Sequence, residues 1–201
     1  MIRVIHIGKC GGSTVSTILR KYNIRHEHVH IKKPIFNNTH KYLIIIRNPI
    51  DRFISAFNWR YKLVVLDKTQ ETRFAGEKET LIKYTSVNTL AERIAEYDVQ
   101  TSYIHHIAED IHFYLGDFLK TCTKEKILGV VTQEDLDHDV YNIFAVRNNN
   151  VHQKNNTKTD KYISPLGRDL LKQYLYKDYD CINKLYAMGC LTEKQYTILS
   201  K

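Results

Sequence analysis

Apolar residues occur in short runs along the chain, and their spacing switches between that of a strand and that of a helix. The first run, residues 2–7, is rich in Ile and Val and leads into a glycine-rich turn, which predicts a buried strand. Apolar residues between 15 and 22 then recur with the spacing of one helix face. A strand, a glycine-rich loop and a helix in this order open a βαβ unit.

Two further strands are predicted before residue 50. Residues 25–31 have the pattern of a half-exposed strand, on which His26, His28 and His30 share one face because strand side chains alternate. Residues 42–46 are continuously apolar, which is typical of a central parallel strand.

The pattern beyond this strand is less regular. Asn48 as N-cap and Pro49 as the first helical residue predict a helix start, whereas residues 63–87 predict an irregular, substrate-facing excursion. The remaining segments, in chain order, are a helix over 88–97, a helix over 109–119, a strand over 127–132, a helix over 135–146, a polar loop over 147–161 and a long helix from Ser164 to Gly189. Strands that alternate with helices predict an α/β fold with a mostly parallel sheet.

Composition narrows the class of protein. A chain of 201 residues with 43% hydrophobic and 26% charged residues is typical of a single globular domain. No apolar run is long enough to span a bilayer, and the first residues lack the apolar core of a signal peptide. The four cysteines are too few for a disulfide framework in a chain of this length and are expected to be reduced thiols. These features predict a cytoplasmic protein, and the abundance of Ile, Lys, Asn and Tyr fits an AT-rich bacterial or viral genome.

The formal net charge of +8 favours an anionic partner, which leaves nucleic acid, an acidic surface or a small ligand with phosphate or sulfate. A solvated basic surface without a partner is the other interpretation.

The glycine-rich turn has the composition of an anion-binding loop. Glycines let backbone N–H groups approach an oxyanion, and a helix N-terminus adds about half a positive charge. Lys9 adds a full charge, and Ser13 and Thr14 add hydroxyl donors. The turn is not a Walker A loop, which would need Gly at 13 and Lys at 14, and it is not GxGxxG. A tight turn with an incidental lysine is the alternative.

A second candidate anion site follows the central strand. Arg47 stands at the carboxyl end of this strand, where ligands bind in open α/β sheets, and thus at the same sheet edge as the Lys9 loop. A guanidinium suits bidentate contact with phosphate. Ser55 lies two turns into the next helix, off its apolar face. Arg52 is expected either to contact the ligand or to form a salt bridge with a nearby acidic residue.

Together the two segments resemble the sulfotransferases that use 3'-phosphoadenosine 5'-phosphosulfate (PAPS). Arg47, Pro49, Arg52 and Ser55 match that family's 3'-phosphate motif, Arg-x-Pro-x-x-Arg-x-x-Ser. The residues that match its 5'-phosphosulfate loop, Lys-x-Gly-Gly-[Ser/Thr]-[Ser/Thr], are Lys9, Cys10, Gly11, Gly12, Ser13 and Thr14. The resemblance implies a single sulfotransferase domain over residues 1–201 with a P-loop-kinase-like fold. It also implies PAPS as donor, PAP as product and no metal.

Within this superfamily the chain is most similar to the carbohydrate group that includes heparan sulfate 2-O-sulfotransferase. The His-x-His-Val sequence from His26 to Val29 matches the strand that carries the family's catalytic base, which implies His28 as first choice and His26 as second. Two other interpretations stay open: surface histidines, or a zinc site made by His26, His28 and His30. His105, His106 and His112 are expected on helix faces.

Two later segments extend the resemblance. Residues 132–136 resemble the family's acidic strand end, and residues 152–185 resemble its C-terminal loop and helix. In that loop Lys154 and Lys158 are expected either to close over the nucleotide or to be solvated. The length of the chain fits a bare catalytic domain without the anchor and stem of the Golgi relatives.

The implied activity is in-line transfer of a sulfuryl group from PAPS to a hydroxyl acceptor, a glycan or small molecule. Lys9 would stabilise charge on the leaving phosphate, and a histidine would act as general base. There are three alternatives to this activity. A P-loop nucleotide kinase would need a Walker lysine, which this chain lacks. The other two are a catalytically dead PAP-binding protein and a basic nucleic-acid-binding protein, of which the motifs disfavour the latter.

Overall fold

The computed structural model describes residues 1–96, 100–148 and 160–201. Its sheet has four strands, β1 (Ile2–His6), β2 (His26–Val29), β3 (Lys41–Ile46) and β4 (Ile127–Thr132), in the order β2-β1-β3-β4. All three strand pairs are parallel, with Val4 opposite both His28 and Leu43. The predicted α/β class with a parallel sheet is therefore confirmed.

The described residues group into two compact units, the first of which lies within Met1–Asn48, Asp110–Asn155 and Lys177–Lys201. The second lies within Pro49–Glu109 and Asn156–Tyr176. The expectation of a single domain over residues 1–201 stays a prediction, and each unit is described by itself below.

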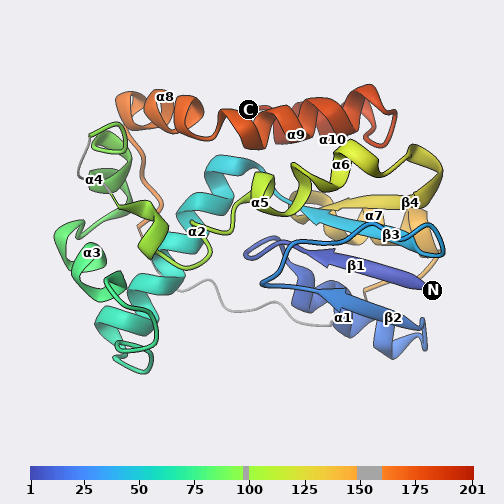
Figure 1. Ribbon diagram of the computed structural model, residues 1–201, viewed down its shortest axis with the longest axis horizontal. Helices are drawn as coiled ribbons and strands as arrows, with labels where there is room; N and C mark the ends of the chain where they lie inside the picture. Colours follow the sequence, from blue (N-terminus) through green and yellow to red (C-terminus); the bar gives the residue numbers. More distant parts are fainter. Residues whose placement is uncertain (97–99, 149–159) are drawn as a thin grey trace. The chain divides into compact units, whose positions relative to one another are not determined.

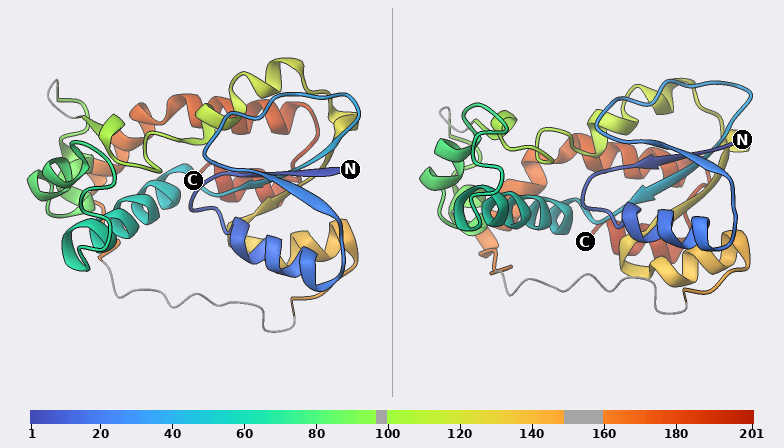
Figure 2. Two further views of the ribbon diagram at one scale, coloured as in Figure 1. Left: turned by 60° about the horizontal axis from the view of Figure 1, so that its bottom comes forward. Right: turned by 90° about the horizontal axis from the view of Figure 1, so that it is seen from below.

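The first unit is built around its parallel sheet. Helices α1 (Gly12–Lys21) and α7 (Leu136–Phe144) lie side by side on one face (Figures 1 and 2). The helices that cover the other face are α5 (Ile111–Leu115), α6 (Phe118–Thr121) and α9 (Tyr176–Ala187). Residues 42–46 of β3 are completely buried, because side chains on both faces of this strand point into helices. Helix α10 (Glu193–Leu199) contributes the Gln195 amide, which donates to the Val130 carbonyl oxygen at 3.0 Å.

The second unit consists of helices. They are α2 (Pro49–Tyr61), the π-helical turn η1 (Lys62–Leu66), α3 (Glu77–Lys83), α4 (Val87–Glu92), the short 3-10 turn η2 (Thr101–Tyr103) and α8 (Pro165–Tyr174). Ser164 caps α8 as predicted, since its hydroxyl accepts from the Gly167 N–H at 3.0 Å. The same hydroxyl donates to Glu92 at 2.6 Å and so ties α8 to α4.

Four expectations about elements were wrong. The helix expected over 88–97 ends at Glu92, and the helix expected over 109–119 is divided into α5 and α6. The segment 63–87 contains η1 and α3 and is not simply irregular. The long helix expected from Ser164 to Gly189 is interrupted at Leu175, where α8 ends before α9 begins at Tyr176. Apolar spacing continues through this interruption, so the sequence pattern does not reveal it.

Over the described ranges, no helix is both long enough and apolar enough to cross a membrane. The four cysteines are free thiols, as predicted.

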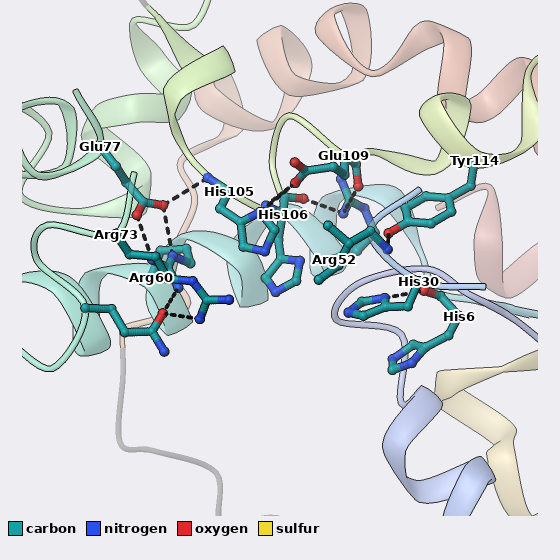
Figure 3. Close-up of polar contacts among 12 residues, drawn as sticks. His6, His30, Arg52, Arg60, Arg73, Glu77, His105, His106, Glu109 and Tyr114 are labelled. Carbon is teal, nitrogen blue, oxygen red and sulfur yellow. Dashed lines mark hydrogen bonds and ion pairs between the residues drawn. The ribbon is translucent and has the colours of Figure 1, made fainter. Parts of the chain in front are cut away.

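A buried ion pair holds the second unit together (Figure 3). The Arg60 guanidinium donates to both carboxylate oxygens of Glu77, at 2.9 and 2.6 Å, and the two side chains are 2% and 1% exposed. Arg60 also donates to the Gln70 side-chain oxygen at 2.7 Å and lies over the Phe74 ring at 5.2 Å. The pair joins α2 to α3 and is fully withdrawn from water.

Glu77→Ala is expected to lower the free energy of unfolding by about 3–5 kcal/mol, because it leaves the Arg60 cation buried without its carboxylate. Urea denaturation followed by circular dichroism measures this loss. Glu79→Ala, on the same helix but exposed, is the matched control and should change little. Equal effects of the two substitutions would contradict the role given to the pair.

Candidate anion-binding site

The loop between β1 and α1 has two residues in the left-handed region. Gly11 has φ 86°, which glycine adopts without strain, whereas Lys9 has φ 68°, which costs a residue with a side chain about 1–2 kcal/mol. Cys10 between them is completely buried, and its N–H donates to the Ile7 carbonyl oxygen at 3.3 Å. Burial of Cys10 therefore holds the loop in a conformation that Lys9 alone would not favour. Local strain of this kind is typical of functional loops.

The loop leads directly into the N-terminus of α1. Gly11 is the N-cap and gives no side-chain hydrogen bond. The Thr14 N–H donates to the Gly11 carbonyl oxygen at 3.0 Å, so among the described residues the first-turn N–H groups left for another acceptor are those of Gly12 and Ser13. At Gly12 a Cβ atom would lie 2.0 Å from Cδ2 of His6, so only glycine lets this ring pack against the helix. Ser13 follows as the first exposed side chain of α1. The result is a helix terminus of the kind that can bind an anion, with a histidine ring against its backbone.

Arg47 lies beside this loop. It follows β3 directly, and its Nη1 donates to the Lys9 carbonyl oxygen at 3.4 Å. Its Nε lies 3.8 Å from Oε1 of Glu134, which follows β4, and 21% of each side chain is exposed. The same Glu134 oxygen accepts from the Asn48 N–H at 3.0 Å. The structure thus brings Lys9 and Arg47 together at the carboxyl edge of the sheet, as the strand order predicted.

A pocket of about 750 Å³ extends from the loop along α1. The residues that line it are His6, Ser13, Ser16, Arg20, Asn23, Ile24, Arg25, His26 and His28. Its walls are one stripe of α1 and the adjoining faces of β1 and β2, and Ser13 in the first turn of α1 joins the pocket to the end of the loop. The lining holds two arginines and three histidines but no acidic residue, which suits a polar or anionic ligand.

The histidines at the pocket are packed against one another. The ring centroids of His26 and His28 lie 5.0 Å apart, and those of His6 and His28 lie 5.7 Å apart. His30, expected on the same strand face, follows the end of β2 and stacks on His6 at 4.2 Å, outside the pocket lining. Nδ1 of His26 lies 2.8 Å from the Ile24 carbonyl oxygen, and since a carbonyl oxygen only accepts, this nitrogen is the donor.

The surroundings of His28 favour its neutral form. Partial burial, together with the positive charges of His26, Arg20 and His30, lowers the pKa of His28 below its ordinary 6.5. Its imidazole is therefore able to accept a proton at neutral pH, as a general base must.

The zinc alternative for the histidines of β2 finds no support in the structure. Within the described ranges, one group of three side chains converges as metal ligands do, and it is His105, His106 and Glu109 in the second unit. The expectation that His105 and His106 lie on a helix face was wrong, because they belong to the turn after η2, where His106 has φ 69°. His112 lies on α5, so its expected helical placement is confirmed.

The remaining motif residues lie in the second unit or outside the described residues. Arg52 on α2 is completely buried, and its Nη1 donates to the carbonyl oxygens of His106 at 2.7 Å and Glu109 at 3.3 Å (Figure 3). Its partners are backbone carbonyls and not the carboxylate of a salt bridge. Ser55 is partly exposed on the same helix, off the buried face as predicted. The segment with Lys154 and Lys158 lies outside the described residues.

Arg20 and Arg25 were not expected at the site from sequence. A signal for Arg20 was present, because the polar residues at 13, 16, 20 and 23 recur with helical spacing on one stripe. Arg25 precedes β2, and no periodicity marks it.

Comparison of the chain with protein-family models, with curated proteins and with solved structures gave no match. The residues of the site are therefore the basis on which its chemistry is argued.

Arg20→Ala is expected to raise the pKa of His28 toward 6.5, because it removes a positive charge that disfavours the imidazolium. An NMR titration of the imidazole resonances measures the shift. Lys21→Ala removes a charge from the next residue, whose side chain is not among the charges that act on His28, and should have a smaller effect. A wild-type His28 that titrates above 6.5 would contradict this account of the pocket.

Proposed function

We propose that the protein is a sulfotransferase that moves a sulfuryl group from PAPS to a hydroxyl acceptor, a carbohydrate or another small molecule. The observation that carries the proposal is the contact of Arg47 with the Lys9 carbonyl oxygen, 3.4 Å, at the carboxyl edge of a parallel sheet. It joins the two segments that resemble the donor-binding motifs of PAPS-dependent sulfotransferases. The strand order and the loop after β1 also fit a P-loop-kinase-like sulfotransferase fold.

The charges at this edge fit a donor with phosphate at two positions. The first-turn amides of α1 and the Lys9 ammonium favour one anionic group, and the Arg47 guanidinium favours a second. A P-loop kinase would need a lysine at position 14, where Thr stands. PAPS would supply a sulfuryl group already activated on a phosphate leaving group. Lys9 is then the residue that stabilises charge developing on that phosphate.

His28 is the proposed general base. It is neutral at physiological pH because its pKa is lowered, and it lines a pocket that begins at Ser13, in the first turn of α1. A volume of about 750 Å³ is within the range of small-molecule sites and accommodates a sugar ring. The acceptor hydroxyl would give its proton to His28 as its oxygen attacks sulfur. His26 is the second choice.

The motif residues of α2 receive different roles. Ser55 is partly exposed in the second unit and keeps, from the resemblance, its proposed role as a ligand of the 3'-phosphate. Arg52 is completely buried and bonded to the carbonyls of His106 and Glu109, so we assign it to positioning that turn and not to donor contact.

PAP is expected to raise the melting temperature of the protein. At about 100 times its Kd, a ligand adds ~2.7 kcal/mol to stability, which for a chain of this length corresponds to roughly 5–10 °C. Lys9→Ala and Arg47→Ala should abolish the shift, whereas the exposed Lys21→Ala should retain it. Differential scanning fluorimetry measures all four proteins. A shift with ATP but none with PAP or PAPS would overturn the proposal.

Transfer of radiolabelled sulfate from PAPS to a panel of hydroxyl acceptors tests the activity itself. His28→Ala should lower kcat by about 10²–10⁴-fold while the PAP-induced melting shift persists, since general base catalysis contributes in that range. His138→Ala, an exposed histidine on α7, is the control. A melting shift without transfer to any acceptor would favour a dead PAP-binding protein. Oligonucleotide binding that survives Lys9→Ala would favour the nucleic-acid alternative.

A further inference from the structure

Three side chains in the second unit converge as metal ligands do. His105, His106 and Glu109 occupy the turn that follows η2, and their potential ligand atoms all lie within 4.8 Å of one another (Figure 3). We propose that they form a binding site for a divalent transition metal, with zinc the ion that best suits two imidazoles and one carboxylate. The proposal concerns the second unit alone and does not rest on sulfuryl transfer.

The distances are close to those of a formed site. Oε2 of Glu109 lies 3.0 Å from Nδ1 of His105 and accepts from the His106 N–H at 2.7 Å. Four-coordinate zinc has metal–ligand bonds of about 2.0–2.2 Å, which places its ligand atoms about 3.4 Å apart. The ligand atom of His106 lies within 4.8 Å of the other two, so it would have to move inward by about 1 Å on metal binding.

The backbone of the turn is already fixed on both sides. Arg52 donates to the carbonyl oxygens of His106 and Glu109, and Glu77 accepts from the His105 N–H at 2.9 Å. Glu77 is itself held by Arg60. His106 is kept at φ 69°, a conformation that projects its side chain beside that of His105, whose ring centroid lies 4.0 Å away. Such supporting contacts orient ligands before a metal arrives.

The donor set suits a cation, because Glu109 supplies a carboxylate oxygen beside the two imidazoles. Of the nearby cations, Arg60 is paired with the Glu77 carboxylate, whereas Arg52 keeps its charge and donates to the backbone carbonyls of His106 and Glu109. With three ligands from the protein, a fourth position is left for water or a substrate oxygen, as in open zinc sites.

The experiment is calorimetric titration of the metal-free protein with zinc chloride. In a separate titration of the metal-free protein with cobalt(II), the visible absorption spectrum is recorded. One ion is expected per chain, with the intense spectrum of a four-coordinate cobalt site. His106→Ala and Glu109→Gln should each weaken the Kd by at least about 10–100-fold, the range seen when even outer contacts of a metal site are removed. Glu109→Gln keeps an oxygen to accept from the His106 N–H, so the turn should persist.

Histidines of the first unit provide the decisive control. His28→Ala and His138→Ala remove a histidine elsewhere and should leave the Kd for zinc unchanged. Melting temperatures of all variants in a chelator verify that each is folded. Absence of zinc binding by the wild-type protein, binding that survives both His106→Ala and Glu109→Gln, or binding lost in His28→Ala would each overturn the proposal.

Discussion

The complete burial of β3 is the constraint on which the first unit depends. A strand that points apolar side chains into helices on both faces has no solvent to satisfy its backbone, so it must pair along both edges. β1 and β4 supply those pairs, and both run parallel to β3. Parallel pairing brings the carboxyl ends of the three strands to one edge. For this reason Lys9, Arg47 and Glu134, far apart in sequence, lie within reach of one another.

Four of the basic residues behind the net charge of +8 lie in this region of the first unit. Lys9 and Arg47 lie at the carboxyl edge of the sheet, while Arg20 and Arg25 line the adjoining pocket. Arg20 belongs to these positive charges and also adds to the effect of burial, which lowers the pKa of His28. The same side chain thus attracts an anionic ligand and helps to keep the proposed base neutral.

The strands and the edge of the sheet were predictable from sequence because they depend on continuous apolar runs. The run at 42–46 identifies β3, and the position of Arg47 after it then follows from the parallel order. The segment 63–87 was not predictable, because the second unit places a charged pair, Arg60 and Glu77, where hydropathy expects apolar residues. A hydropathy pattern does not distinguish the charged residues of a buried ion pair from exposed surface residues.

The histidines likewise fall into a group whose positions were predictable from sequence and a group whose positions were not. His26 and His28 follow strand alternation, which is local, and line the pocket as their pattern suggests. His105 and His106 depend on long-range contacts, because Arg52 on α2 and Glu77 on α3 fix the turn that carries them. No periodicity in their own segment records those contacts, and a helix was the wrong expectation.

The contact of His6 with Gly12 has a consequence for how the site can change by mutation. His6 presses its ring on the backbone of the anion loop and on its other side stacks with His30. A side chain added at Gly12 would therefore displace His6 and, with it, the stacked His30. Within the pocket lining, Ser16 is buried and Arg20 contributes to the lowered pKa of His28, whereas Arg25 is exposed and lies outside the loop. Directed evolution toward a new ligand would therefore be most productive at Arg25.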